Sequence, residues 1–284
     1  MQLNALLPTR DIGTDASKIR DWAQAAEDLG YAGIEVADHV FGAAARDGWT
    51  PLYSEKDPFH ETFVMLGFLA AVTRKVQLSS GVLILPQRQT GVVAKQAAEV
   101  DILSGGRLRL GIGVGWNFVE YEALNADWKT RGAQQAEQVE VLRRLWTGEL
   151  VTFKGKFHNL NAVNITPAPI QRPIPIWFGG SSDAVVKRAA RIGDGWMPIM
   201  SPEEAAPKLA ALRDHLKAFG RDPATFGIEG WLRMTEPDPA RWRSAVEGWR
   251  KLGAGTVMLY PMYRMPKFDE QIETLRRFKE VAQG

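Results

Sequence analysis

The stretch that decides the fold is residues 105–117, GGRLRLGIGVGWN, in which a buried strand runs directly into glycines. Glycine weakens a strand interior, so three glycines in five positions indicate that another backbone or a flat ligand approaches closely there. A tight turn from a strand into a helix, without any ligand, explains the same pattern. The alternating residues are Leu108, Leu110 and Ile112 on the apolar side, and Gly111, Gly113 and Gly115.

The composition is that of an ordinary globular protein. The chain has 284 residues and 45% hydrophobic content, which is enough to bury a large core. The 35 lysines and arginines nearly balance the 33 aspartates and glutamates and are scattered along the chain, which argues against nucleic-acid binding. Cysteine is absent from the sequence, which excludes disulfides, thiolate metal sites and cysteine nucleophiles.

Targeting and metal-binding signals are also missing from the sequence. The N-terminal apolar run is short, and no segment approaches the roughly 20 apolar residues of a membrane span. We therefore expect a cytoplasmic protein. No cluster of His, Asp and Glu has metal-ligand spacing, and neither HExxH nor a P-loop motif is present, so we expect no metal.

Short apolar runs alternate with amphipathic segments along the whole chain. Apolar residues at spacings of three and four, such as Ile19, Trp22 and Ala26, predict helices between the runs. Eight strand–helix units in a chain of this length predict a (β/α)8 TIM barrel, formed as a single domain over residues 1–284. The predicted strands are residues 2–7, 33–37, 76–83, 107–113, 174–178, 195–199, 226–233 and 256–260.

Two connections are long for a compact domain, and such loops tend to be functional. The first is an insertion after strand 2, residues 38–58, which carries Trp49 and Tyr53. The second is an insertion after strand 4, residues 116–173, in which we expect a helix over 134–146 and a hairpin that pairs 151–153 with 156–158. We expect both insertions to cover the C-terminal ends of the strands, where the active sites of this fold lie.

The second strand ends in ADHV, residues 37–40, which places Asp38 and His39 at the mouth of the barrel. Histidine can carry a proton near neutral pH. A single histidine at a strand end is more often a hydrogen-bonded structural residue, but the position at this end of a barrel favours chemistry. We therefore predict His39 as the catalytic acid or base, with Asp38 as the next candidate. The remaining histidines are expected to be structural or solvated: His60, His158 and His215.

Two further segments have unusually small side chains. The third strand has bulky residues on both sides of three small ones at residues 79–81, SSG. The small side chains allow a bulge or a ligand ring lying flat on the backbone, and they are equally explained by close packing within the protein. The fifth strand ends in GGSS, residues 179–182, and enters a helix, so its backbone N–H groups form a candidate phosphate site. A helix start capped by Ser181 explains the same turn, and Asp183 argues mildly against a bound anion.

Five motifs together resemble the luciferase-like family of flavin and deazaflavin oxidoreductases. The resemblance spans nearly the whole chain, and the block 94–117 is its most specific part. It implies a TIM barrel that binds FMN or the deazaflavin coenzyme F420 at the C-terminal mouth, often as a dimer. The motifs are ADH at 37–39, SSGVLILP at 79–86, AKQAAEVDILSGGRLRLGIGVGWN at 94–117, PIPIWFGGSS at 173–182 and RIGDGWMP at 191–198.

The resemblance also implies roles for the motifs. His39 would lie beside the reactive ring of the cofactor, and a non-proline cis peptide at or beside Gly81 and Val82 would back that ring. The GIGVG motif would line the other flank of the ring, and the GGSS turn would take the phosphate. The implied cofactor-binding residues are Ser80, Gly81, Val82, Gly113, Gly115, Trp116, Gly179, Gly180, Ser181 and Trp196.

The sequence departs from part of this family at Trp116. Some sugar-phosphate dehydrogenases of the deazaflavin branch carry a glutamate proton donor just after the fourth-strand glycines, where Trp116 stands here. This difference argues against a sugar-phosphate substrate. Trp116, Trp49 and Trp196 either stack on a ligand or serve as buried packing anchors.

The predicted function is hydride transfer between coenzyme F420 and an unidentified small organic substrate. One alternative is an FMN-dependent monooxygenase that uses oxygen and receives reduced flavin from a flavin reductase. A non-catalytic flavin-binding protein is the alternative of another class. An NAD-dependent Rossmann dehydrogenase fits poorly, because the glycine motif follows three complete strand–helix units and departs from GxGxxG. We expect a homodimer that acts on a small molecule, with no nucleic-acid or membrane partner.

Overall fold

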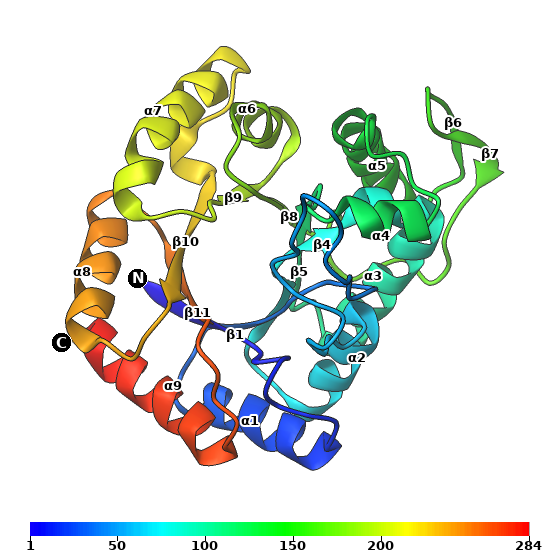
Figure 1. The fold of residues 1–284 in the computed structure, drawn as a ribbon. Helices are drawn as coiled ribbons and strands as arrows, with labels where there is room; N and C mark the ends of the chain where they lie inside the picture. The colour runs from blue at the N-terminus through cyan, green and yellow to red at the C-terminus, as the bar shows by residue number, and fades with distance from the viewer. Residues whose placement is uncertain (284) are drawn as a thin grey trace.

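The computed structural model describes residues 1–283 and contains a closed barrel of eight parallel strands (Figure 1). The strands pair in the order β3-β2-β1-β11-β10-β9-β8-β5, and the pairing of β3 with β5 closes the ring. The TIM barrel predicted from the sequence is therefore confirmed, with strand ends shifted by at most a few residues. The barrel strands are β1 Gln2–Leu6, β2 Gly33–Val36, β3 Gln77–Ser80, β5 Leu108–Gly113, β8 Ile176–Gly179, β9 Gly195–Met197, β10 Gly227–Met234 and β11 Thr256–Pro261.

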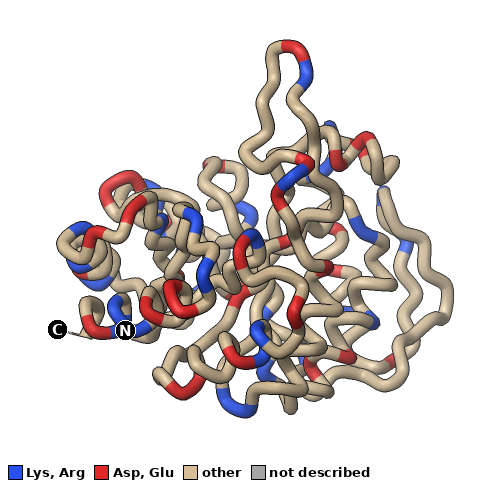
Figure 2. The backbone as a smooth tube through the Cα atoms, turned by 60° about the horizontal axis from the view of Figure 1, so that its bottom comes forward, with Lys and Arg blue, Asp and Glu red and all other residues tan. Residues whose placement is uncertain are grey.

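Helices follow each barrel strand and form an outer ring (Figure 1). Asp15, Ser182 and Ser201 cap three of them by accepting backbone N–H groups of the first turn. Basic and acidic residues are interspersed along the chain (Figure 2). Over residues 1–283, no helix has the length and apolar character to cross a membrane. The helices are α1 Ala16–Asp28, α2 Thr62–Val72, α3 Thr90–Ser104, α4 Phe118–Ala123, α5 Arg131–Leu145, α6 Asp183–Ile192, α7 Pro202–Ala218, α8 Pro239–Lys251 and α9 Phe268–Gln283.

The third barrel strand is interrupted where the sequence changes to small residues. β3 ends at Ser80, and the short strand β4, Leu83–Ile84, resumes the pairing with β5. The peptide bond between Gly81 and Val82 is cis, as predicted. A 3-10 turn, η1 Leu85–Gln87, then leads to α3. The predicted single strand over 76–83 is therefore two strands separated by a break that faces the mouth of the barrel.

The second insertion forms a hairpin that projects beside α5 (Figure 1). Its strands are β6 Val151–Lys154 and β7 Asn159–Val163, so the prediction that residues 156–158 pair with 151–153 is wrong. The physical reason is Glu137 on α5, whose carboxylate accepts the backbone N–H groups of Lys156, Phe157 and His158 at 2.8 Å. Amides turned toward this carboxylate cannot pair with β6, and pairing begins only at Asn159.

Three charged side chains meet inside the barrel. Arg109 on β5 donates from Nη2 to Glu35 on β2 and to Glu229 on β10, both at 2.8 Å. Burial and the nearby charge of Glu229 raise the pKa of Glu35 well above the usual 4.5, although Arg109 opposes the shift. Arg109 carries one positive charge against two buried carboxyl groups, so it only partly offsets the rise in the pKa of Glu35. This cluster lies directly against Gly81, because a Cβ atom there would stand 2.5 Å from Glu35 Oε2.

Candidate active site

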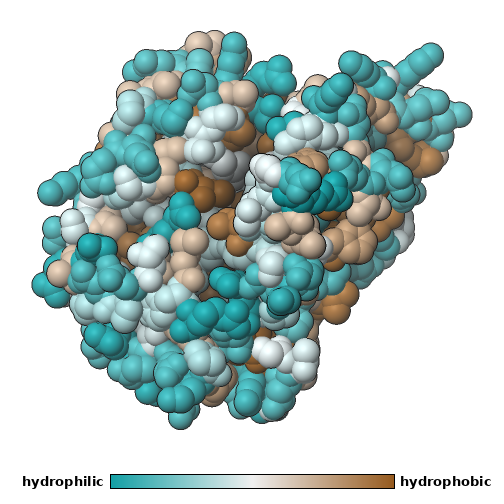
Figure 3. Space-filling model, viewed as in Figure 1, coloured by the Kyte–Doolittle hydropathy of each residue, from teal (hydrophilic) through white to brown (hydrophobic). Residues whose placement is uncertain are grey.

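A cleft of about 420 Å³ opens at the C-terminal ends of the barrel strands. This volume lies in the range of small-molecule sites, roughly 300–1,000 Å³. Figure 3 shows the molecule in the same view as Figure 1. A hollow near the centre of this face is edged by hydrophobic side chains. Ten of the twelve predicted site residues line the cleft: Asp38, His39, Gly81, Val82, Gly113, Gly115, Trp116, Gly179, Gly180 and Ser181.

The other two predicted residues lie behind the cleft wall. Ser80 is fully buried and donates its hydroxyl to the carbonyl oxygen of Gly111 at 2.7 Å. Trp196 is also fully buried, and its indole N–H donates to the carbonyl oxygen of Gly180 at 2.8 Å. Each therefore supports a backbone segment of the cleft from below. Of the two readings of Trp196, the structure favours the packing anchor.

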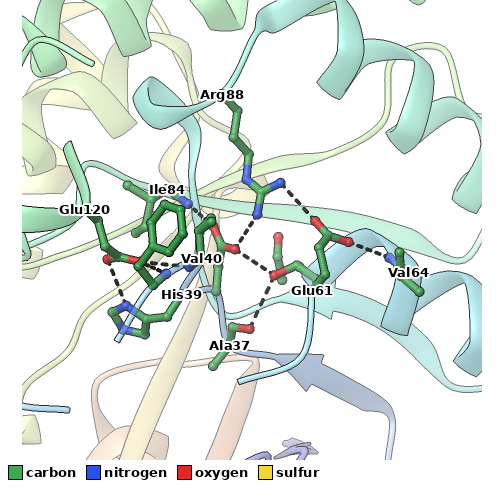
Figure 4. Close-up of polar contacts among 12 residues, drawn as sticks. Ala37, His39, Val40, Glu61, Val64, Ile84, Arg88 and Glu120 are labelled. Carbon is green, nitrogen blue, oxygen red and sulfur yellow. Dashed lines mark hydrogen bonds and ion pairs between the residues drawn. The ribbon is translucent and has the colours of Figure 1, made fainter. Parts of the chain in front are cut away.

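His39 is held at the cleft by a carboxylate on the second insertion. Its Nδ1 lies 3.0 Å from Glu120 Oε2, while Glu120 Oε1 accepts the backbone N–H groups of Val40 at 2.8 Å and Phe41 at 3.1 Å (Figure 4). In residues 1–283, His39 Nε2 has no hydrogen-bond partner. An ionised Glu120 accepts a hydrogen bond from Nδ1–H, which leaves the Nε2 lone pair free.

Three aromatic rings pack against His39. The ring centroids of Phe59, Tyr53 and Trp116 lie 4.7, 5.4 and 5.6 Å from that of His39, in edge-on arrangements. The side chain of His39 is only 11% exposed. These contacts and the Glu120 hydrogen bond fix the ring in one orientation. The other three histidines do not line the cleft.

Glu120 was not recognised from the sequence. It lies on the short helix α4, which begins after Asn117, whose side chain accepts the N–H of Val119. The family resemblance points to a glutamate only at position 116, where Trp116 stands. The available signal was Asn117 followed three residues later by Glu120, a spacing typical of a helix N-terminus with a glutamate in its first turn.

Asp38 has a different role from His39. Its Oδ2 accepts the backbone N–H of Ile84 at 2.7 Å, and its Oδ1 accepts from Arg88 at 2.6 Å and from Thr62 at 2.9 Å (Figure 4). Both carboxylate oxygens are therefore engaged, and the ion pair with Arg88 stabilises the charge. This geometry argues against Asp38 as a proton carrier. It anchors the segment after Val82 to β2 and α2.

The glycines around Val82 make room for parts of the protein itself. A Cβ atom at Gly113 or Gly179 would stand 2.7 Å from a methyl group of Val82. A Cβ atom at Gly111 would collide with the carbonyl oxygen of Ser80. Gly111 is therefore required by the close approach of another backbone segment. Gly113 and Gly179 are required by the side chain of Val82. Gly115, with φ of +68°, forms the turn that ends the strand.

The turn between β8 and α6 presents a helix start to the cleft. Ser182 is the N-cap residue and accepts the N–H of Val185 at 3.3 Å, so Ser181 is not used for capping. Gly180 has φ of +118°, a conformation that favours glycine. Asp183 points to Lys208 at 2.7 Å, and that contact lowers its pKa. The first-turn N–H groups of a helix lack intrahelical acceptors, so this turn can hold an anion.

The cleft wall opposite the glycines was missed by the sequence analysis. Trp231 and Arg233 on β10 line it, together with Tyr260 and Met262 at the end of β11. Tyr53 of the first insertion reaches across, and its hydroxyl is hydrogen-bonded to that of Tyr260. These positions carry no local motif, because they meet only when the barrel closes. In residues 1–283, no group of three or more His, Asp or Glu side chains is arranged to hold a metal ion.

The closed barrel, with a histidine held at a cleft above its strands, defines the chain as a TIM-barrel protein. The family model described as luciferase-like monooxygenase matches residues 1–283, and the chain belongs to that family. It is 30% identical to an F420-dependent glucose-6-phosphate dehydrogenase of Kineococcus radiotolerans, over 83% of this chain and 69% of that protein. Uncharacterised proteins of Mycobacterium bovis and Mycobacterium tuberculosis are 38% identical to it over 182 residues. This alignment covers 62% of this chain and 62% of the length of those relatives.

Two solved structures share the fold. Monooxygenase RslO1 from Streptomyces bottropensis superimposes with a TM-score of 0.83 at 22% identity, over 100% of this chain and 99% of that one. An F420-dependent secondary alcohol dehydrogenase, solved with an F420–acetone adduct, gives a TM-score of 0.80 at 18% identity, over 99% and 97% of the two chains. The predicted family and fold are thus confirmed.

Proposed function

We propose that this enzyme transfers a hydride between coenzyme F420 and a small organic substrate, with His39 moving the accompanying proton. The observation that carries the proposal is the imidazole of His39, a residue that lines the cleft, whose Nδ1 is held by Glu120 and whose Nε2 has no hydrogen-bond partner in residues 1–283. The relative from Kineococcus radiotolerans is an F420-dependent dehydrogenase, which supports F420 over FMN.

The cleft residues fit a flavin-type cofactor. Val82 forms an apolar projection between the bare glycine segments, against which a flat ring can lie. The start of α6 offers unpaired backbone N–H groups for a phosphate, with Gly180 and Ser181 leaving the approach open. When bound, the deazaflavin supplies the hydride-accepting ring carbon, and the protein supplies position and polarity.

His39 has the geometry to move a proton at the substrate. Oxidation of an alcohol removes a hydride from carbon and releases the hydroxyl proton, which needs an acceptor. With Nδ1–H bonded to Glu120, Nε2 can accept this proton, and Nε2–H can return it in the reverse reaction. The positive charge that forms on the imidazole is stabilised by the adjacent carboxylate.

An FMN-dependent monooxygenase is the second candidate. The superposition on monooxygenase RslO1 over the whole of this chain is the observation that favours it. In that case, the protein would need oxygen and a flavin reductase as a partner. A cytoplasmic homodimer, with one domain over residues 1–284, belongs to the proposal in either case, and light scattering of the purified protein tests the dimer.

Separate titrations of the purified protein with F420 and with FMN, followed by absorbance, test the choice of cofactor. We expect the dissociation constant for F420 to be at least about tenfold lower than that for FMN, a difference of about 1.4 kcal/mol. A panel of alcohols should then reduce the bound F420. Tight binding of FMN without binding of F420 would overturn the proposal in favour of the monooxygenase.

A further inference from the structure

We propose that the wall formed by β10 and β11 binds the carboxylate of the substrate, with Arg233 as its ion-pairing partner. This inference rests on the proposed function, because it assigns the glycine side of the cleft to the cofactor. It adds the chemical class of the substrate, which is a small carboxylic acid with an apolar or aromatic body.

The charge of the cleft wall is the first observation. Apart from His39, the lining contains two charged side chains, Asp38 and Arg233. Asp38 has its own counter-charge in Arg88 at 2.6 Å, which also pairs with the more exposed Glu61 at 3.0 Å. In residues 1–283, Arg233 has no carboxylate within 4.0 Å, and only its Nε is engaged, by the sulfur of Met262 at 3.2 Å. The terminal nitrogens of Arg233 are therefore available to an anion, and a planar guanidinium matches a carboxylate.

Polar groups beside Arg233 complete the site. The hydroxyls of Tyr53 and Tyr260 share one hydrogen bond, so one of the two O–H groups remains free to donate. Burial raises the pKa of Tyr53, while the charges of Arg10 and Arg233 oppose the shift, so Tyr53 keeps its proton near neutral pH. Trp231 is only 6% exposed and lines the cleft, and its indole N–H has no partner in residues 1–283. The Arg233 guanidinium and a tyrosine hydroxyl are thus the donors on this wall, whereas the indole nitrogen of Trp231 is buried beneath the cleft surface.

The apolar surfaces between Arg233 and His39 indicate the body of the ligand. The ring centroids of Tyr53 and His39 lie 5.4 Å apart. The hydroxyl of Tyr53 is hydrogen-bonded to that of Tyr260. The Trp231 and Tyr260 rings pack edge to face at 5.5 Å. A substrate whose carboxylate lies at Arg233 would extend past Tyr53 and bring its reacting oxygen toward His39 Nε2. Aromatic walls favour an apolar or aromatic body over a sugar.

The competing source of an anion is the cofactor itself, because F420 carries carboxylates in its tail. The glycine turn that would take the phosphate follows β8, and β9 separates β8 from β10 in the sheet. The experiment must therefore distinguish a substrate carboxylate from a carboxylate of the cofactor.

Calorimetric titration with benzoate and with its neutral analogue benzamide tests the proposal, on protein with and without F420. We expect benzoate to bind more tightly than benzamide, and Arg233→Met to weaken benzoate binding by about 10- to 100-fold. Binding of benzamide and of F420 should stay within about twofold. Arg233→Lys should retain part of the preference for benzoate, and Arg276→Met on the exposed face of α9 is the matched control.

Three results would overturn the inference. They are equal binding of benzoate and benzamide by the parent protein, unchanged benzoate binding in Arg233→Met, and a loss of F420 affinity as large as that for benzoate. The last result would assign Arg233 to the cofactor tail. If neither F420 nor FMN binds to the parent protein, the proposed function fails. The benzoate and benzamide titrations of the cofactor-free protein still decide the role of Arg233.

Discussion

The same arrangement of a glutamate and a histidine occurs twice in this protein, once at the cleft and once in the projecting hairpin. Glu120 accepts hydrogen bonds from two backbone N–H groups and is hydrogen-bonded to Nδ1 of His39. Glu137 accepts hydrogen bonds from three backbone N–H groups and is hydrogen-bonded to Nδ1 of His158. The difference lies at Nε2. In His158 it is bonded to the Thr90 hydroxyl at 2.6 Å, whereas in His39 it has no partner in residues 1–283. Orientation by a carboxylate is thus a local folding device, and the two histidines differ in whether the second nitrogen is still available to a ligand.

Replacing each histidine separately should have the largest effect of all these changes, and it should separate a catalytic role of His39 from a structural role of His158. His39→Asn should reduce kcat by about 10²–10⁴-fold, because general acid–base catalysis contributes an effect of that size, while the cofactor dissociation constant changes only a few-fold. His158→Asn should leave kcat within about twofold. Single-turnover reduction of bound cofactor by an alcohol substrate measures the step. Reduction at the parent rate in His39→Asn would make His39 a structural strand-end residue.

Replacement of Glu120 by glutamine should have the next largest effect. A glutamine amide donates to Nδ1 of His39, so the imidazole takes the tautomer with the proton on Nε2, and that nitrogen no longer accepts. We expect kcat to fall by about 10- to 100-fold with little change in cofactor affinity. Nitrogen NMR of the imidazoles should show the change of tautomer. Glu137→Gln should shift the His158 signals without changing kcat, and an unchanged His39 tautomer in Glu120→Gln would contradict the assignment.

Glu35 provides the contrast of a buried carboxyl group without backbone amides around it. Its pKa is raised in the folded state, so the folded protein keeps a proton that the unfolded chain loses above pH 4.5. The contribution of Glu35 to stability is therefore complete below that pH and is lost as the pH rises through the folded pKa. Relative to Glu35→Gln, the parent should lose up to about 1.4 kcal/mol per pH unit in this window. Urea unfolding from pH 5 to 8 measures the difference, and parallel curves would show that Glu35 is ionised throughout.

Glu137 should show the opposite pH dependence with a smaller effect. Burial alone would raise its pKa, but the hydrogen bonds from His158, Phe157 and Lys156 outweigh burial and lower it. Its stabilising contribution is therefore present above pH 4.5 and is lost as the pH falls through the folded pKa. We expect Glu137→Gln to cost about 1–2 kcal/mol at pH 7 and less in acid. A cost that grows toward acidic pH in urea unfolding would contradict this sign.

The barrel could be predicted from the sequence because each strand is a local signal. Apolar runs that end in glycine or polar residues mark all eight strands, and their number fixes the architecture. The hairpin was misplaced because Glu137, nearly 20 residues earlier, determines which amides can pair. Glu137 on α5 determines the register of the hairpin, and no pattern within the hairpin sequence indicates that contact.

The candidate site was predictable where fold position identified it. His39 was found because it follows a barrel strand, whereas Glu120 reaches it from α4 and Arg233 lines the cleft from β10, far away in the sequence. The three charges inside the barrel were missed for the same reason. Glu35, Arg109 and Glu229 come from three strands, and only the register brings them together.

Val82, just before β4, packs against Gly113 on β5 and Gly179 on β8, and this contact restricts how the three positions can change in evolution. Its two methyl groups fill the spaces left by the missing side chains of Gly113 and Gly179, at 2.7 Å from where those Cβ atoms would stand. A larger residue at either glycine requires a smaller one at position 82, and a larger residue at 82 has nowhere to expand. We therefore expect these three positions to covary among related proteins, and a Gly113→Ala lineage to survive only where position 82 has already become alanine or glycine.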